Sequence, residues 1–240
     1  MESAMIDLIG ATVLGAVSVL VVFAYVIVLP ASMRGRIASA FAIWFALVIA
    51  CGATGAFGAV RGMGPAGMGI AVMLPLVALS YFVMRAGPLN EALQTIPLPA
   101  LIGVHAVRLL GGFLVLLYLQ GRLPAPFAPA AGWGDVLIGA TALPVAYLAA
   151  TRAPAWRIAT LLWNTLGLLD LVDAIALGVA SSPGLPFGHG TPGASSDLMT
   201  TLPWILIPCF NVPLLALQHL MIFRRLWHSL PEHPVVARQG

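Results

Sequence analysis

Long apolar runs follow one another along this chain, separated by short polar or proline-rich links. Each run can cross about 30 Å of hydrocarbon as a helix, and none alternates with a period of two as a barrel strand does. Inside a bilayer every backbone N–H and C=O has to be paired within its segment, so such runs become α-helices. The pattern predicts an all-α polytopic bundle whose spans cover residues 6–30, 37–60, 66–84, 98–120, 131–150, 156–180 and 198–222.

The third of these segments has the lowest helix propensity, because it contains Gly67, Gly69 and Pro75. Glycine and proline are tolerated in a membrane helix where neighbouring helices pair the backbone groups that they free. We therefore expect seven spans, and a six-span bundle is the alternative.

Composition excludes a soluble domain, because 60% of the residues are hydrophobic and only 8% are charged. The basic residues are all arginine and are scattered at the predicted span boundaries, so the net charge of +3 does not indicate a nucleic-acid partner. The expected partner is the lipid bilayer. The absence of lysine beside abundant Ala, Gly and Arg is typical of a GC-rich bacterial genome, which favours a bacterial inner membrane. Retinal is bound through a Schiff base to lysine, so the absence of lysine also excludes a seven-span rhodopsin.

Arginine placement predicts the orientation of the bundle, since basic residues beside short loops are retained in the cytoplasm. With the N-terminus outside, only Arg61 and Arg122 lie outside, while Arg108 falls within a span. The remaining arginines would lie inside, namely Arg34, Arg36, Arg85, Arg152, Arg157, Arg224, Arg225 and Arg238. We therefore expect one transmembrane domain over residues 1–225, with an external N-terminus, and a short cytoplasmic tail over residues 226–240.

Ionisable side chains inside the predicted spans carry most of the functional information. Such a group costs about 3 kcal/mol or more at mid-bilayer, so it normally has a partner. Arg108 lies in the fourth span, with His105 one helical turn away on the same face. At about 1.5 Å per residue, Asp170 of the sixth span lies about 6 Å farther out than Arg108, within reach of its side chain. We predict an Arg108–Asp170 pair that acts either as a packing lock or as the centre of a working site.

Other polar residues lie near this pair. Asn164 and Asp173 are in the sixth span, and Asp135 is at the start of the fifth, where it could instead cap the helix N-terminus. One arginine cannot neutralise three carboxylates at close range, so a surplus acid must be protonated, hydrated or matched by a cation.

The seventh span has polar residues at helical spacing along one face, so we expect Asn211 to face the bundle. Its prolines Pro203, Pro208 and Pro213 predict a distorted helix with free carbonyls that could bind a cation or substrate. His219 is placed near the inner interface. That position lies about 10 Å along the membrane normal from His105, which disfavours a haem held between the two rings. No cofactor and no metal site is indicated by the sequence.

Two glycine-rich regions have structural interpretations. Gly52, Gly55, Gly58 and Gly62 predict a ridge of small residues for close helix packing in the second and third spans, which also offers a surface for oligomers. The outer link over residues 181–197 is rich in Gly, Pro and Ser, and we interpret it as a mobile external loop, or alternatively as a lid over the last two helices.

The segment GWGD at residues 132–135 resembles the GxGD signature of intramembrane aspartyl proteases such as presenilins and type IV prepilin peptidases. The match covers four residues. It implies that Asp135 would work with a second membrane aspartate, Asp170 or Asp173, to activate a water molecule. In those families the second aspartate precedes the motif, whereas here both candidates follow it. The seven-span topology is also similar to that of SWEET-type sugar transporters and of vitamin permeases.

The sequence therefore predicts a helical bundle with an internal polar site among the fourth to seventh spans that transports or conducts a small solute or ion. The alternatives are a GxGD-type protease and a structural or accessory subunit of a membrane complex, and we lean against an enzyme. The candidate residues of the solute or ion pathway are His105, Arg108, Asp135, Asn164, Asp170, Asp173, Asn211 and His219.

The predicted orientation can be tested with topology reporters. A reporter fused after Arg225 should be cytoplasmic, and one inserted in the 181–197 link should be external, because arginine-rich ends are retained inside. Protease protection in membrane vesicles measures both positions. The opposite labelling would reverse every depth stated above.

Overall fold

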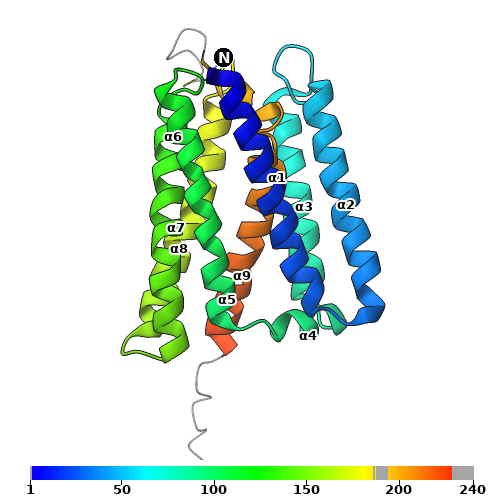
Figure 1. Ribbon diagram of the computed structural model, residues 1–240, viewed down its shortest axis with the longest axis vertical. Helices are drawn as coiled ribbons and strands as arrows, with labels where there is room; N and C mark the ends of the chain where they lie inside the picture. The colour runs from blue at the N-terminus through cyan, green and yellow to red at the C-terminus, as the bar shows by residue number, and fades with distance from the viewer. Residues whose placement is uncertain (1, 186, 188–193, 229–240) are drawn as a thin grey trace, which may run out of the picture.

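The computed structural model describes residues 2–185, 187 and 194–228, and this part of the chain is all-α (Figure 1). In chain order the α-helices are α1 (Glu2–Val28), α2 (Ala31–Thr54), α3 (Gly64–Met84), α4 (Pro88–Gln94), α5 (Leu98–Gly103), α6 (Gly112–Leu119), α7 (Phe127–Thr151), α8 (Trp156–Ala180) and α9 (Val212–His228). Two 3₁₀ segments, η1 (Val104–Gly111) and η2 (Ser196–Thr200), and one π-helical segment, η3 (Ile207–Asn211), complete the described helices.

Seven spans in the described part of the chain are long and apolar enough to cross a membrane, which confirms the seven-span prediction over the six-span alternative. The fourth span joins α5, η1 and α6 into one helix over Leu98–Leu119. The third is α3, which keeps Pro75 in its interior. The protein is therefore integral to a membrane.

Three spans differ clearly from the prediction. The second covers Ala31–Thr54 instead of 37–60. The fifth span begins at Phe127 instead of residue 131. The seventh covers Ile207–Trp227 instead of 198–222, because η2 and a turn with Pro203 occupy the residues before it. These shifts move Asp135 and His219 deeper into the bundle than counting from the predicted ends suggested.

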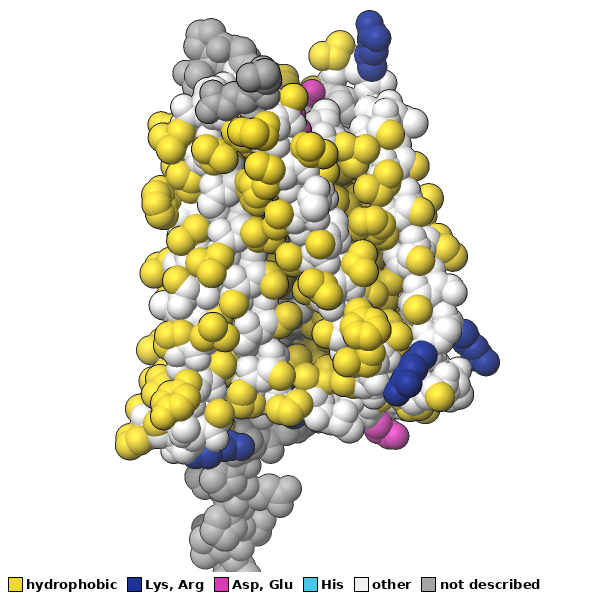
Figure 2. Space-filling model, in the orientation of Figure 1, with side chains coloured by type: hydrophobic (Ala, Val, Ile, Leu, Met, Phe, Trp, Pro, Cys, Tyr) yellow, Lys and Arg dark blue, Asp and Glu magenta, His cyan; other side chains and the backbone are white. Residues whose placement is uncertain are grey.

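The surface of the bundle is that of a protein surrounded by lipid. Hydrophobic side chains cover its sides, while the charged side chains in view lie toward its two ends (Figure 2). Large apolar residues such as Ile43 and Leu47 on α2 are about 60% exposed. Lipid tails solvate such residues without cost, so they need no protein partner.

The two ends of the described chain lie at opposite ends of the bundle, as an odd number of spans requires (Figure 1). Which end faces the cytoplasm remains a prediction. Residues from 229 onward, most of the predicted cytoplasmic tail, lie outside the described part of the chain.

Arginines at the end where α9 finishes bind backbone carbonyls of other helices. The short helix α4 runs across this end of the bundle (Figure 1). Arg225 of α9 donates to the carbonyl oxygens of Leu93, Gln94 and Ile96, and its bond to Ile96 is 2.9 Å long. These bonds satisfy carbonyls that the end of a short helix leaves without partners, and they attach α4 to α9.

Two of the spans contain segments of irregular backbone. In η1 the three residues per turn align His105, Arg108 and Gly111 on one line, and all three are buried. The prolines of the seventh span produce the predicted distortion, because Pro208 lies within the π-helical segment η3 and cannot donate a backbone hydrogen bond. Below η3 the chain continues as the regular helix α9.

The predicted glycine ridge is mostly wrong. Only Gly52 lies inside α2, where a Cβ would come within 2.8 Å of the Ile205 side chain. Gly55 ends the helix with φ of 67°, and Gly58 and Gly62 belong to the link before α3. The glycines of this region therefore form a helix cap and a turn, and oligomer formation here remains an expectation.

Arg225→Met should destabilise the protein, because three carbonyls of the α4 connection lose a charged donor at once. Hydrogen bonds to charged groups contribute about 1.5–3 kcal/mol, so we expect a clear fall in Tm during thermal unfolding in detergent. Arg36→Met is the matched control, since it removes the same charge from an exposed residue at the same end. Equal Tm values for the two variants would contradict the bracing role of Arg225.

Candidate functional site

The guanidinium of Arg108 is the centre of a buried polar cluster, and its side chain is 0% exposed. Its Nε donates to Asp135 Oδ1 of α7 at 2.6 Å. On α8, its Nη2 donates to Asp170 Oδ2, and its Nη1 donates to the Gly167 carbonyl oxygen at 2.9 Å. The predicted Arg108–Asp170 ion pair is therefore confirmed, and Asp135 shares the same arginine.

Asp135 does not cap its helix. Because α7 begins at Phe127, Asp135 lies more than two turns inside it. Its position depends on Gly111 of η1, where a Cβ would come within 2.3 Å of the Asp135 Cβ. The alternative in which Asp135 caps the helix N-terminus is therefore wrong.

The glycines of the GWGD segment have a packing role. A Cβ on Gly134 would lie 1.6 Å from Asp170 Oδ1, so only glycine lets this carboxylate lie against α7. A Cβ on Gly132 would lie 2.9 Å from the carbonyl oxygen of Gly111. These contacts account for both glycines of the motif.

The two acids are also arranged unlike an aspartyl protease dyad. In such a dyad two carboxyl groups share one proton and hold a water molecule between them. Here Asp135 Oδ1 and Asp170 Oδ2 each accept a hydrogen bond from a different nitrogen of the Arg108 guanidinium. The geometry argues against the protease alternative.

His219 of α9 completes the cluster as a neutral ring. Arg108 Nη1 lies 3.1 Å from His219 Nε2, and arginine can only donate, so Nε2 is the acceptor. The proton is then on Nδ1, which donates to Asn164 Oδ1 at 2.8 Å, while Asn164 Nδ2 donates back to the His219 carbonyl oxygen at 3.0 Å. The prediction that His219 lies near the inner interface is wrong, because α9 continues to His228 and the ring is fully buried.

His105 packs against His219. The two ring centroids are 4.1 Å apart, and the Trp163 ring lies edge-on to His105 at 5.3 Å. The separation of about 10 Å between His105 and His219 that residue counting predicted is therefore wrong. Neither ring nitrogen of His105 has a hydrogen-bond partner within the described residues. A haem does not fit between rings in contact, and both nitrogens of His219 are already engaged.

The remaining candidates separate into one that joins the site and one that does not. Asn211 faces the bundle as predicted, because Ser18 Oγ of α1 donates to its Oδ1 at 3.0 Å. Asp173 is exposed on α8 and makes no ion pair among the described residues. It lies three residues after Asp170, which rotates it about 60° away from that residue's direction. Asp173 therefore lies outside the ion-paired cluster, and its role in the pathway stays a prediction.

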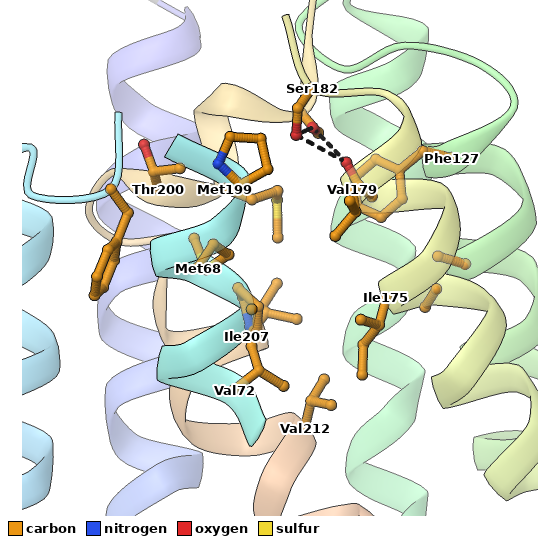
Figure 3. Close-up of a pocket in the computed structure, with 18 of the residues that line it drawn as sticks. Met68, Val72, Phe127, Ile175, Val179, Ser182, Met199, Thr200, Ile207 and Val212 are labelled. Atoms are coloured by element: carbon orange, nitrogen blue, oxygen red, sulfur yellow. Dashed lines mark hydrogen bonds between the residues drawn. The ribbon is translucent and has the colours of Figure 1, made fainter. Parts of the chain in front are cut away.

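A cavity adjoins the cluster on the side toward the end of the bundle where α1 begins. It encloses about 820 Å³ of space that no protein atom fills, its open mouth included. Met68 and Val72 of α3 lie opposite Ile175 of α8, and Ser182 and Thr200 lie at the far end from Val212 (Figure 3). Asp135 is part of the lining, so the cavity reaches the ion-paired acid.

A second, smaller cavity lies between α1, η1 and η3 and is lined by Arg108, Asp135 and Asn211. Asp135, Leu171, Ile207 and Val212 line both cavities. Asp135 therefore borders both cavities.

The mouth of the larger cavity is polar, and sequence reasoning missed it. Ser196 Oγ donates to the Gly178 carbonyl oxygen at 2.6 Å, and Asp197 Oδ1 accepts from the Ala59 N–H at 2.9 Å. The sequence contained one signal for structure at this mouth, because a serine two residues before an aspartate is typical of a helix N-cap. In the structure Ser195 caps η2, and its Oγ accepts from the Asp197 N–H. The central part of the predicted external loop, residues 186 and 188–193, lies outside the described residues, and the lid alternative with it.

The fold and the buried cluster define a polytopic integral membrane protein with a charged site among its last four spans. The chain belongs to the family described as domain of unknown function (DUF8737), whose model matches residues 65–227. That range runs from α3 to the end of the seventh span and contains the whole cluster around Arg108. No curated protein and no solved structure matches the chain.

Removing Arg108 should destabilise the bundle, because two buried carboxylates lose their cation. Arg108→Met is expected to cost about 3–5 kcal/mol, seen as a lower Tm in detergent. Adding Asp170→Asn should recover part of the loss, and adding Asp135→Asn as well should recover more. Asp173→Asn, which removes an exposed acid from the same helix, is the control and should leave Tm unchanged. Strictly additive losses across the series would contradict a coupled cluster.

Proposed function

We propose that this protein moves a small solute or ion across the membrane by way of the Arg108 cluster. The observation that carries the proposal is that Asp135, an ion-paired acid inside the bundle, borders two cavities. A charge pair that served only to lock packing would be surrounded by close-packed side chains. Open space beside a buried charge is instead what a binding site for a passing solute requires.

The charges of the cluster support the same interpretation. Arg108 supplies one positive charge, Asp135 and Asp170 supply two negative charges, and His219 is neutral. The cluster therefore carries one surplus negative charge while both acids are ionised. A charge without a partner is costly inside a membrane, so the site favours the arrival of a cation or a proton.

Backbone irregularity and further polar groups extend along the route. η1 carries Arg108, and η3 lines both cavities through Ile207. Interrupted helices of this kind expose carbonyls that bind substrates and ions in transporters. On the other side of the cluster, His105 and Thr160 are buried and have polar atoms without a hydrogen-bond partner in the described structure. These groups can bind a solute or a proton on its way.

The accessory-subunit alternative is supported by the same ion pairs but does not account for the cavities. We also propose a bacterial inner membrane as the location, on the grounds of the lysine-free, arginine-rich composition.

Flux measurements in proteoliposomes test the proposal. The purified protein is reconstituted with a pH-sensitive dye inside, a pH gradient is imposed, and neutral, anionic and cationic solutes are added in turn. At least one class should collapse the gradient faster than in protein-free liposomes. Asp135→Asn should slow this flux at least about tenfold, since it removes the acid that borders both cavities, while Asp173→Asn should not change it. Gradients that decay equally with wild-type protein, Asp135→Asn and no protein would contradict transport.

A further inference from the structure

We infer that the larger cavity binds a hydrophobic organic cation, a protonated amine whose ammonium group binds Asp135 and whose apolar body lies between α3 and α8. This inference deepens the proposed function by naming the class of solute, and it rests on the same site. Binding to the cavity can nevertheless be measured without any flux.

The charges that line the cavity select the sign of the ligand. Asp135 and Asp197 both contribute to the lining, and none of the lining residues is an arginine or a histidine. An anion would therefore meet two acids and no cation. The surplus negative charge of the Arg108 cluster adds to this selection, because a bound ammonium group would bring the cluster to neutrality.

A specific oxygen is available for the ammonium group. Arg108 Nε uses Oδ1 of Asp135, while Oδ2 has no hydrogen-bond partner in the described part of the structure. The side chain is 15% exposed, in contrast to the fully buried arginine. An ammonium N–H donated to Oδ2 would form a charge-assisted hydrogen bond, the strongest kind available to a carboxylate.

The walls of the cavity select an apolar body. Met68 and Val72 line one wall and Ile175 and Val179 the other, with Phe127 toward the mouth (Figure 3). A bare metal cation needs several oxygen ligands, and no three His, Cys, Asp or Glu side chains gather to hold a metal among the described residues. Hydrocarbon walls with a single carboxylate at the inner end match an amine with a hydrophobic tail.

The experiment compares three ligands that differ only in their head group, namely 4-phenylbutylamine, 4-phenylbutanol and 4-phenylbutyrate. Binding to the full-length protein in lipid nanodiscs is measured by calorimetry, with empty nanodiscs subtracted to remove partitioning into lipid. We expect the amine to bind at least about tenfold more tightly than the alcohol, as one charge-assisted hydrogen bond allows, and the carboxylate not to bind.

Three variants locate the binding. Asp135→Asn should bring the amine and the alcohol to equal affinity, while Asp173→Asn should keep the preference for the amine. Ala174→Phe adds a ring to a residue that lines the cavity and leaves every charge in place, so it should abolish binding of both ligands. It also keeps the test decisive if Asp135→Asn fails to fold, which gel filtration would reveal.

Equal affinity of the wild-type protein for amine and alcohol, or tighter binding of the carboxylate, would overturn the inference. Amine binding that survives Ala174→Phe would also overturn it, because the ligand would then lie elsewhere. Failure of the proposed function has a different signature, since amine binding would persist in nanodiscs while no solute crossed proteoliposomes. If the protein transported another class of solute but did not bind the amine, the inference would be overturned and the proposed function would stand.

Discussion

A guanidinium that cannot lose its proton, placed inside a membrane, sets the conditions for the rest of this structure. Arg108 has to be surrounded by acceptors, because an unpaired charge in hydrocarbon costs several kcal/mol. Three helices supply them: α7 through Asp135, α8 through Asp170 and the Gly167 carbonyl, and α9 through the ring of His219. One side chain thereby joins four of the seven spans.

Such close contact needs helices without bulky side chains at the points of approach. A Cβ on Gly139 would come within 2.6 Å of the Leu109 backbone nitrogen, and one on Gly167 would come within 2.5 Å of the His219 ring. Gly134 makes the corresponding space for Asp170. The 3₁₀ geometry of η1 contributes as well, because it aligns His105 and Arg108 with Gly111 on the buried side. A motif that resembles a catalytic signature is thus explained by the packing that brings two acids to one arginine.

The same arrangement leaves the cluster electrically unbalanced and incompletely packed. Two acids face one arginine, and the π-helical segment η3 with the η2 turn leaves a cavity above them. Stability alone would favour a neutral, fully packed interior. The surplus charge and the cavity coincide at Asp135, and this coincidence is the basis for proposing a solute that brings a positive charge.

The sequence by itself determined the features that depend on local composition. Hydropathy located the seven spans, since crossing the bilayer depends on the apolar length of each segment. The cost of a lone arginine was enough to predict its pairing with Asp170, and the prolines were enough to predict a distorted seventh helix. Each of those inferences depended on the composition of a single segment, or on one charged residue that is too costly to leave unpaired in a membrane.

Only the tertiary structure decided which other groups meet at Arg108. Asp135 joins the arginine and Asp173 does not, because helix rotation turns one acid inward and the other outward. His219 reaches His105 because the seventh helix begins and ends several residues later than its hydropathy suggested, which changes the depth of every residue on it. The cavity likewise depends on how α3, α8 and η3 diverge. Lipid accepts an apolar helix in any rotation, so hydropathy carries little information about rotation or depth, and packing between helices sets both.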